Sequence, residues 1–241
     1  MIILLKKELQ HFFSSATGYI VIGVFLLVTS LFLWVFPGEY NILESGYAQT
    51  DGLFTLAPFL YLFLVPALTM RMFAEEKRTG TIELLYTRPI KGLHIVLAKY
   101  LAGWILVLFS LLPTIIYFFS VYYLADPVGN VDTGAFWGSF IGLLFLASIY
   151  VAIGLFASAL TDNQIVSFIT AVLLSFFFFY GFELFSGLIS SGKWADIVSS
   201  LGINYHYESM SRGVIDSRDV VYFLTTTAIF IFSTKLIIKR A

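Results

Sequence analysis

The sequence has 241 residues, of which 59% are hydrophobic and 12% are charged, whereas soluble domains carry about 25% charged residues; this composition excludes a water-soluble globular fold. Fourteen lysines and arginines against fifteen acids leave a net charge of −1, which provides no general attraction to nucleic acid. Because the chain has no cysteine, disulfides, thiolate metal sites and cysteine nucleophiles are also excluded.

The first expected element is an amphipathic helix over residues 1–17. Apolar residues recur there at helical spacing, at Ile2, Leu5, Leu9, Phe12, Phe13 and Ala16. Polar residues, among them Lys6 and Lys7, take the other side. Such a helix would lie in the membrane interface with its lysines toward lipid phosphates. A simple N-terminal extension of the first membrane span is the alternative.

Six membrane spans follow. A helix needs about 20 apolar residues to cross roughly 30 Å of hydrocarbon. Five charge-free runs approach or exceed this length, and Lys235 near the end of a sixth can snorkel to the headgroups. The runs cover residues 19–36, 53–70, 100–124, 135–160, 165–182 and 220–238. The sequence therefore predicts an all-α, polytopic membrane protein whose residues 1–241 form a single domain, with kinks expected at Pro58, Pro66 and Pro113.

The orientation follows from the positive charges, which are retained on the cytoplasmic side of short loops. Two lie near the N-terminus, six between residues 71 and 99, and three at the C-terminus, eleven of the fourteen in all. The opposite side would hold only Lys193, Arg212 and Arg218, together with ten acids. We therefore expect both termini in the cytoplasm.

The loop over residues 74–98 carries the sharpest local pattern. Gly80 can end the helix that continues from the second span, because glycine adopts a left-handed conformation at little cost. Thr81 is then placed to cap a new helix, and Glu83 suits the positive end of that helix. Arg88 is pushed toward extended geometry by Pro89 and marks the far end.

The resulting helix of about two turns would offer Leu84 and Leu85 as an apolar face between charged ends. Such a surface suits docking into a groove on a soluble partner, although an ordinary helix on the membrane surface remains an equal alternative.

Two further segments carry structural signals. Gly138 and Gly142 form a G-x-x-x-G pair in the fourth span, which predicts close helix packing within this chain or against a partner. Residues 183–219 are too apolar for a free loop and too short to span. We expect short re-entrant helices in the outer leaflet there.

The sequence offers few of the residue patterns that form metal, catalytic or nucleotide-binding sites. His11, His94 and His206 fall in three different segments, so a metal site is not expected. The spans contain no histidine and no mid-span Asp, Glu or Arg, which disfavours an intramembrane hydrolase or an ion-coupled carrier. Gly187 to Lys193 matches G-x-x-x-x-G-K, but Trp194 stands where a magnesium-binding hydroxyl is required. We interpret this match as a coincidence and expect any ATP to be bound by another chain.

The 74–98 loop resembles the permease subunits of type-2 ABC exporters, whose corresponding loop reads E-E-x-x-x-G-T-x-E-x-L. The matching residues are Glu75, Glu76, Gly80, Thr81, Glu83 and Leu85, followed by Arg88 and Pro89. The resemblance covers nearly the whole chain. Residues 38–41, 45–47, 57–59 and 66–71 look most like the gliding-motility-associated permease subunits of Bacteroidetes.

The resemblance implies a transporter of two permease chains, alike or paired with a related permease, and two cytoplasmic ATPase subunits in a bacterial inner membrane. The coupling contact with the ATPase would then involve Glu75, Glu76, Gly80, Thr81, Glu83, Leu84, Leu85, Arg88 and Pro89. It implies no cofactor in this chain, no nucleic-acid partner, and contact with membrane lipid. A membrane scaffold or anchor of the gliding or secretion apparatus that transports nothing is the alternative, motivated by the sparse polarity of the spans.

Overall fold

The computed structural model describes residues 1–83, 91–189 and 192–240 as a bundle of helices, and these residues contain no strand. In chain order the helices are α1 (Ile2–Ser14), α2 (Ala16–Ser30), η1 (Leu31–Val35), α3 (Asp51–Thr69), α4 (Arg71–Arg78), α6 (Gly92–Leu111), η2 (Leu112–Thr114), α7 (Ile115–Leu124), α8 (Thr133–Leu160), α9 (Gln164–Phe176), η3 (Phe177–Gly181), α10 (Phe182–Ser186), α11 (Gly192–Ser199), α12 (Ile203–Ser211) and α13 (Ser217–Arg240). Six segments are long and apolar enough to cross a membrane: Ala16–Val35, Asp51–Arg78, Gly92–Leu124, Thr133–Leu160, Gln164–Ser186 and Ser217–Ile238. The predicted all-α plan with six membrane-spanning helices is confirmed.

The N-terminal helix is separate from the first span. Ser15 adopts an extended conformation (φ −102°, ψ 151°), which ends α1 before α2 begins at Ala16. The helix is therefore not a simple extension of α2. Its buried residues are Leu4, Glu8 and Phe12, so the buried stripe is rotated from the predicted apolar face. The rotation brings the carboxylate of Glu8 against α6, on which α1 packs.

A proline marks one interruption in the spans. Pro58 and Pro66 both lie inside α3, which ends at Thr69. Pro113 lies in η2, a short 3₁₀ segment between α6 and α7. Proline cannot donate the backbone hydrogen bond that an α-helix requires, which accounts for the change of helical geometry at Pro113.

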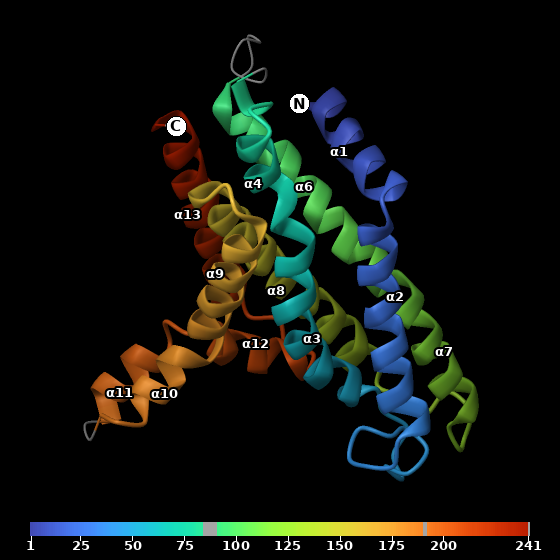
Figure 1. Ribbon diagram of the computed structural model, residues 1–241. Helices are drawn as coiled ribbons and strands as arrows, with labels where there is room; N and C mark the ends of the chain where they lie inside the picture. Colours follow the sequence, from blue (N-terminus) through green and yellow to red (C-terminus); the bar gives the residue numbers. More distant parts are fainter. Residues whose placement is uncertain (84–90, 190–191, 241) are drawn as a thin grey trace.

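Helix α8 forms the centre of the bundle (Figure 1). It packs against α3, α6, α9, α12 and α13, and 78% of the residues in its most apolar stretch are buried. The side chain of Asp132 caps its first turn by accepting a hydrogen bond from the N–H of Ala135 at 2.8 Å. Asn163 caps α9 in the same way.

The two ends of the bundle contain different segments of the chain. Figure 1 places both termini and the end of α4 at one end, which we call the termini end. The helices α10, α11 and α12 lie toward the opposite end (Figure 1). Within the segment 74–98, α4 continues to Arg78, as expected of a helix that Gly80 ends, but α6 already begins at Gly92, earlier than the span predicted from Tyr100. The segment 183–219 contains short helices, as its apolar residues suggested.

Candidate functional site

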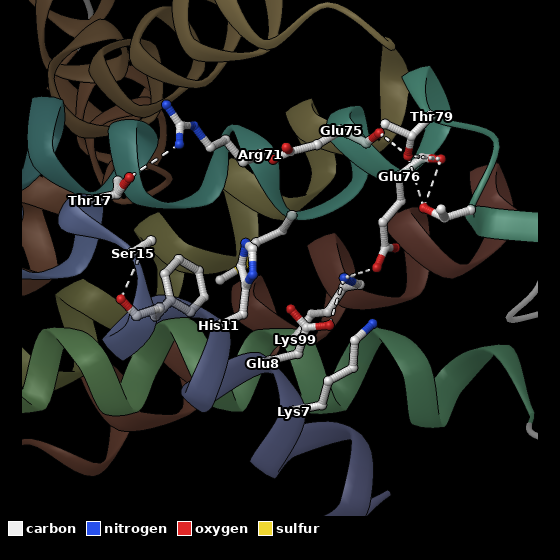
Figure 2. A pocket seen from close by; sticks show the side chains of 13 residues that line it. Lys7, Glu8, His11, Ser15, Thr17, Arg71, Glu75, Glu76, Thr79 and Lys99 are labelled. Carbon is white, nitrogen blue, oxygen red and sulfur yellow. Dashed lines mark hydrogen bonds and ion pairs between the residues drawn. The ribbon is translucent and has the colours of Figure 1, made fainter.

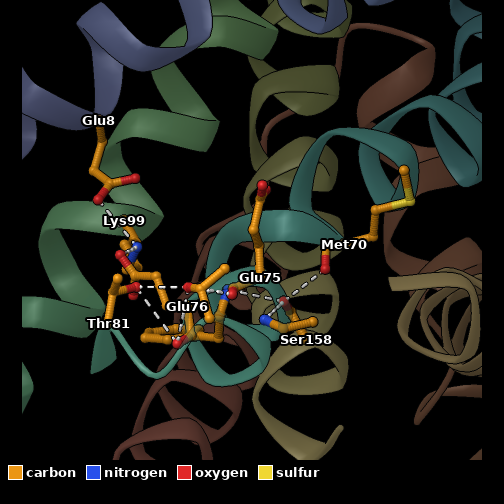
Figure 3. Close-up of polar contacts among 10 residues, drawn as sticks. Glu8, Met70, Glu75, Glu76, Thr81, Lys99 and Ser158 are labelled. Atoms are coloured by element: carbon orange, nitrogen blue, oxygen red, sulfur yellow. Dashed lines mark hydrogen bonds and ion pairs between the residues drawn. The ribbon is translucent and has the colours of Figure 1, made fainter. Parts of the chain in front are cut away.

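The junction between α3 and α4 is held by a side chain from the central helix. Where the helix is interrupted at Met70, the first N–H groups of α4 lack their usual acceptors. The buried hydroxyl of Ser158 on α8 accepts hydrogen bonds from the N–H groups of Phe73 (3.0 Å) and Ala74 (3.1 Å). It also donates to the carbonyl oxygen of Met70 at 2.9 Å (Figure 3). The Ser158 hydroxyl therefore provides hydrogen-bond partners both for the first N–H groups of α4 and for the carbonyl group at the end of α3.

A second bond fastens α4 to the end of α8. The ammonium of Lys77 donates to the carbonyl oxygen of Ala159, in the last turn of α8. That carbonyl belongs to the end of a helix, where partial negative charge favours a cation. Between them, Ser158 and Lys77 fix both the beginning and the last turn of α4 to the central helix.

Facing the other side of α4 is a buried ion-pair cluster that joins three helices (Figures 2 and 3). The ammonium of Lys99 on α6 lies 3.0 Å from Glu8 Oε1 on α1 and 2.9 Å from Glu76 Oε1 on α4. The side chain of Lys99 is 1% exposed, and its ammonium also lies 5.1 Å from the centre of the Phe73 ring. We call Glu8, Lys99 and Glu76 the charge cluster.

The charge cluster has more negative than positive charge. Two carboxylates share one ammonium, so the cluster carries an excess of one negative charge. Glu76 Oε2 is buried and has no hydrogen-bond partner among the residues that the structure describes. A buried charge is costly without a partner, so each member of the cluster constrains where the other two helices can lie.

Sequence reasoning missed this cluster. The positive-charge pattern places Lys99 in the loop between the second and third spans, and no pattern used there singles out Glu8. Two signals could have found them. Glu8 stands four residues from both Leu4 and Phe12, on one face of a helix, and Lys99 follows an apolar run from Ile95 to Ala98.

The turn after α4 folds back on that helix. Gly80 has a φ of +69°, in the left-handed region that its predicted role as a helix terminator requires. Its N–H donates to the carbonyl oxygen of Lys77 at 3.2 Å. The hydroxyl of Thr81 contacts the hydroxyl of Thr79 at 3.0 Å and the carbonyl oxygen of Glu76 at 3.5 Å, both on the α4 side.

The remaining predicted coupling residues lie at the edge of the described chain or beyond it. Glu75 and Glu76 lie on α4, and Glu76 belongs to the charge cluster. Glu83 is exposed, and its N–H donates to the carbonyl oxygen of Gly80 at 3.4 Å in a new helical turn. Leu84, Leu85, Arg88 and Pro89 lie outside the described residues, so the apolar face of the predicted helix and the capping role of Thr81 stay predictions.

The two predicted packing glycines lie in the half of α8 nearer the opposite end. A Cβ atom at Gly138 would collide with the backbone of Gly213, and one at Gly142 would collide with the side chain of Met210 on α12. Further along α8, a Cβ atom at Gly154 would collide with Thr69 at the end of α3. The small residues of α8 therefore meet other parts of this same chain at very short range.

The described residues contain no group of three or more histidines and acids arranged to hold a metal ion. His206 lies far along the chain from the charge cluster, on α12, where it bonds Asp219 Oδ1 at 2.7 Å and the carbonyl oxygen of Ser200 at 2.9 Å. The charge cluster, by contrast, joins α1, α4 and α6.

Comparison with known proteins gives one family. A family model described as "ABC-2 family transporter protein" matches residues 38–233, from the segment before α3 to within α13. The match leaves out α1 and the first span. No curated protein matches the chain.

Proposed function

Because the chain belongs to the ABC-2 family of transporter proteins and is thereby a transmembrane subunit of an ABC transporter, we propose that it is the gate of an exporter driven by a separate ATPase chain. In this proposal ATP is bound by the partner, and the segment around residues 74–98 receives the movement of the ATPase. The observation that supports the proposal is that α4 is bonded at the termini end to α1 and α6 through the charge cluster and to α8 through Ser158 and Lys77.

These contacts allow α4 to transmit a movement of the ATPase to the helices around it. The charge cluster ties α4 to α1 and α6, while Ser158 and Lys77 tie it to α8. A force applied to the turn at Gly80 therefore cannot displace α4 alone, because at least three hydrogen-bonded contacts would have to break. It displaces the group of helices as a unit.

Helix α8 supplies a path to the other end of the bundle. Its 28 residues extend about 42 Å, which exceeds the thickness of the hydrocarbon core. Its last turns hold α4, and its first half packs against α12 and Gly213. Nucleotide can move a gate only if the ATPase states favour different permease conformations, and α8 is the element on which such a preference can act at both ends.

The orientation belongs to the same proposal. With the termini end in the cytoplasm, the segment of residues 74–98 faces a soluble ATPase, and the helices α10 to α12 face the outside, where they would close the exit. Support comes from the positive charges, of which eleven of fourteen were assigned by sequence to the cytoplasmic side.

We further propose a bacterial inner membrane as the location and a second permease chain as a partner, identical to this one or related to it. The resemblance of residues 38–71 to gliding-motility permease subunits such as GldF supports a role in that system.

Glu83 provides the most direct test of the ATPase contact. It is exposed next to Gly80 and contacts no described side chain through a hydrogen bond, so Glu83→Lys reverses a surface charge without disturbing the bundle. We expect the ATPase encoded with this chain to co-purify with the native protein and to be lost from the variant. Glu39→Lys, an equally exposed acid at the opposite end, is the matched control and should retain the ATPase. Retention by both variants would contradict the proposed contact.

A further inference from the structure

A cavity of about 290 Å³ opens between α1, α4 and α6 at the termini end (Figure 2). This volume is close to the lower end of small-molecule sites, about 300 Å³, and is large for a packing defect. Its lining includes the charged and polar residues Lys7, His11, Arg71, Glu75 and the charge cluster. The function proposed above uses the charge cluster as a brace but leaves the cavity unexplained.

The charges around the cavity are ordered along α4. Arg71 opens the helix at its junction with α3, and Glu75 and Glu76 follow one turn later, about 6 Å further from α3. The guanidinium of Arg71 donates to the hydroxyl of Thr17, at the start of α2. The level nearer α3 is therefore positive.

The part of the cavity at the level of the carboxylates has a net negative charge, even when its two lysines are counted. Lys7 and Lys99 stand there against Glu8, Glu75 and Glu76, which leaves an excess of one negative charge. Lys99 is already shared by two carboxylates. The carboxylate of Glu75 makes no ion pair and no hydrogen bond with the residues that the structure describes. Glu75 therefore lacks a paired cation at this level.

We propose that this cavity binds the headgroup of a phospholipid that carries a primary ammonium, with its phosphate at Arg71 and its ammonium at Glu75. A phosphoethanolamine group has the required order of charges, because its phosphate is nearer the acyl chains and its ammonium extends away from them. The ammonium supplies N–H donors for the carboxylate of Glu75, which a trimethylated ammonium cannot do. The acyl chains would continue beside α2 and α3 into the hydrocarbon. The inference does not depend on transport.

The test is lipid retention by the full chain, purified with phosphatidylethanolamine, phosphatidylcholine or phosphatidylglycerol of identical acyl chains and measured by native mass spectrometry. Phosphatidylethanolamine should be retained about tenfold more than either of the others, since only it offers both the phosphate and the N–H donors. Equal retention of the three lipids would overturn the proposal.

Two variants locate the lipid. Arg71→Gln and Glu75→Gln should each lower phosphatidylethanolamine retention about tenfold, as expected when one charge-assisted bond is removed. Arg71→Lys, which keeps the charge, should retain part of the binding and shows that the bundle is intact. Arg212→Gln, an exposed arginine paired with Glu208 on α12, is the matched control and should behave like the native chain. If Arg71→Gln and Glu75→Gln match this control, the site is wrong.

Competition distinguishes a lipid from a free anion. Inorganic phosphate and soluble phosphoethanolamine are added separately to the lipid-loaded protein. We expect inorganic phosphate to displace no lipid and phosphoethanolamine to displace it only weakly, because neither has acyl chains. Full displacement by inorganic phosphate would assign the cavity to a soluble anion and overturn the lipid assignment.

Discussion

At Lys99, one ammonium group pairs with two carboxylates, those of Glu8 and Glu76, which lie 91 and 23 residues away in the sequence. Removing two carboxylates and an ammonium from water costs several kcal/mol per ion, and only close pairing offsets this cost. The arrangement is consequently sensitive to the loss of any one member. A residue that composition alone would place at the surface thus decides how α1, α4 and α6 meet.

We predict that Lys99→Met destabilises the protein by roughly 3–5 kcal/mol, because Glu8 and Glu76 would be left buried without their cation. Thermal unfolding of the purified protein in detergent measures the effect. Lys6→Met, which removes an exposed lysine from α1, should change stability by less than about 0.5 kcal/mol. The triple variant Glu8→Leu, Glu76→Leu, Lys99→Met should recover most of the loss. A Lys99→Met protein as stable as Lys6→Met would show that the pairing contributes nothing.

A second prediction at this scale concerns glycine. Gly138→Ala should destabilise the protein by about 1–3 kcal/mol, since the new methyl group meets the backbone of Gly213, which cannot rotate away. Gly23→Ala in α2 is the matched control, because no atom lies within 4 Å of its Cβ position. That change should be neutral or slightly stabilising, as alanine favours a helix over glycine. Equal thermal stability of the two variants would contradict the close approach of α8 to Gly213.

Among the elements, α4 depends most on its surroundings. It has eight residues, fewer than an isolated helix needs to be stable in water. Its first N–H groups are completed by Ser158 from α8, and its face toward α6 is held by the charge cluster. Tertiary contacts therefore stabilise α4, and they place its end beside the turn at Gly80.

Ser158→Ala should loosen α4 while leaving the spans intact. Two buried N–H groups lose their acceptor, and each loss costs about 1–3 kcal/mol. Hydrogen exchange of residues 73–78 should accelerate roughly tenfold or more, with little change in α9. Ser120→Ala on α7, whose hydroxyl bonds only to Ile116 of its own helix, is the control. Unchanged exchange at residues 73–78 would exclude the proposed role of Ser158.

The elements also show how far the sequence predicts the structure. Hydropathy located every span, since a charge-free run of this length has few alternatives. The charge-free run of the third span begins at Tyr100, yet α6 begins at Gly92, because Lys99, which interrupts the run, is paired inside the bundle. Such pairings join residues that no local pattern relates. The positive φ of Gly80 was predictable, because glycine is the residue that adopts it at little cost.

On the scale of the whole molecule, α8 connects the two ends that the proposed function needs to couple. The termini end holds α4 through Ser158 and Lys77, and the opposite end holds α12 and Gly213 against glycines. A packed contact of this kind has few intermediate positions, because small shifts create collisions or voids. The molecule is thus suited to alternate between discrete arrangements when the end of α4 is displaced.

The most direct test of this account measures whether nucleotide changes the opposite end of the bundle. The chain has no cysteine, so Trp194→Cys places a single reactive thiol at an exposed position of α11. In the complex with the ATPase, the labelling rate of this thiol by a maleimide should change on addition of ATP, and Glu83→Lys should abolish the change. A labelling rate that is the same with and without ATP in a complex that hydrolyses ATP would contradict the account and support a static membrane scaffold.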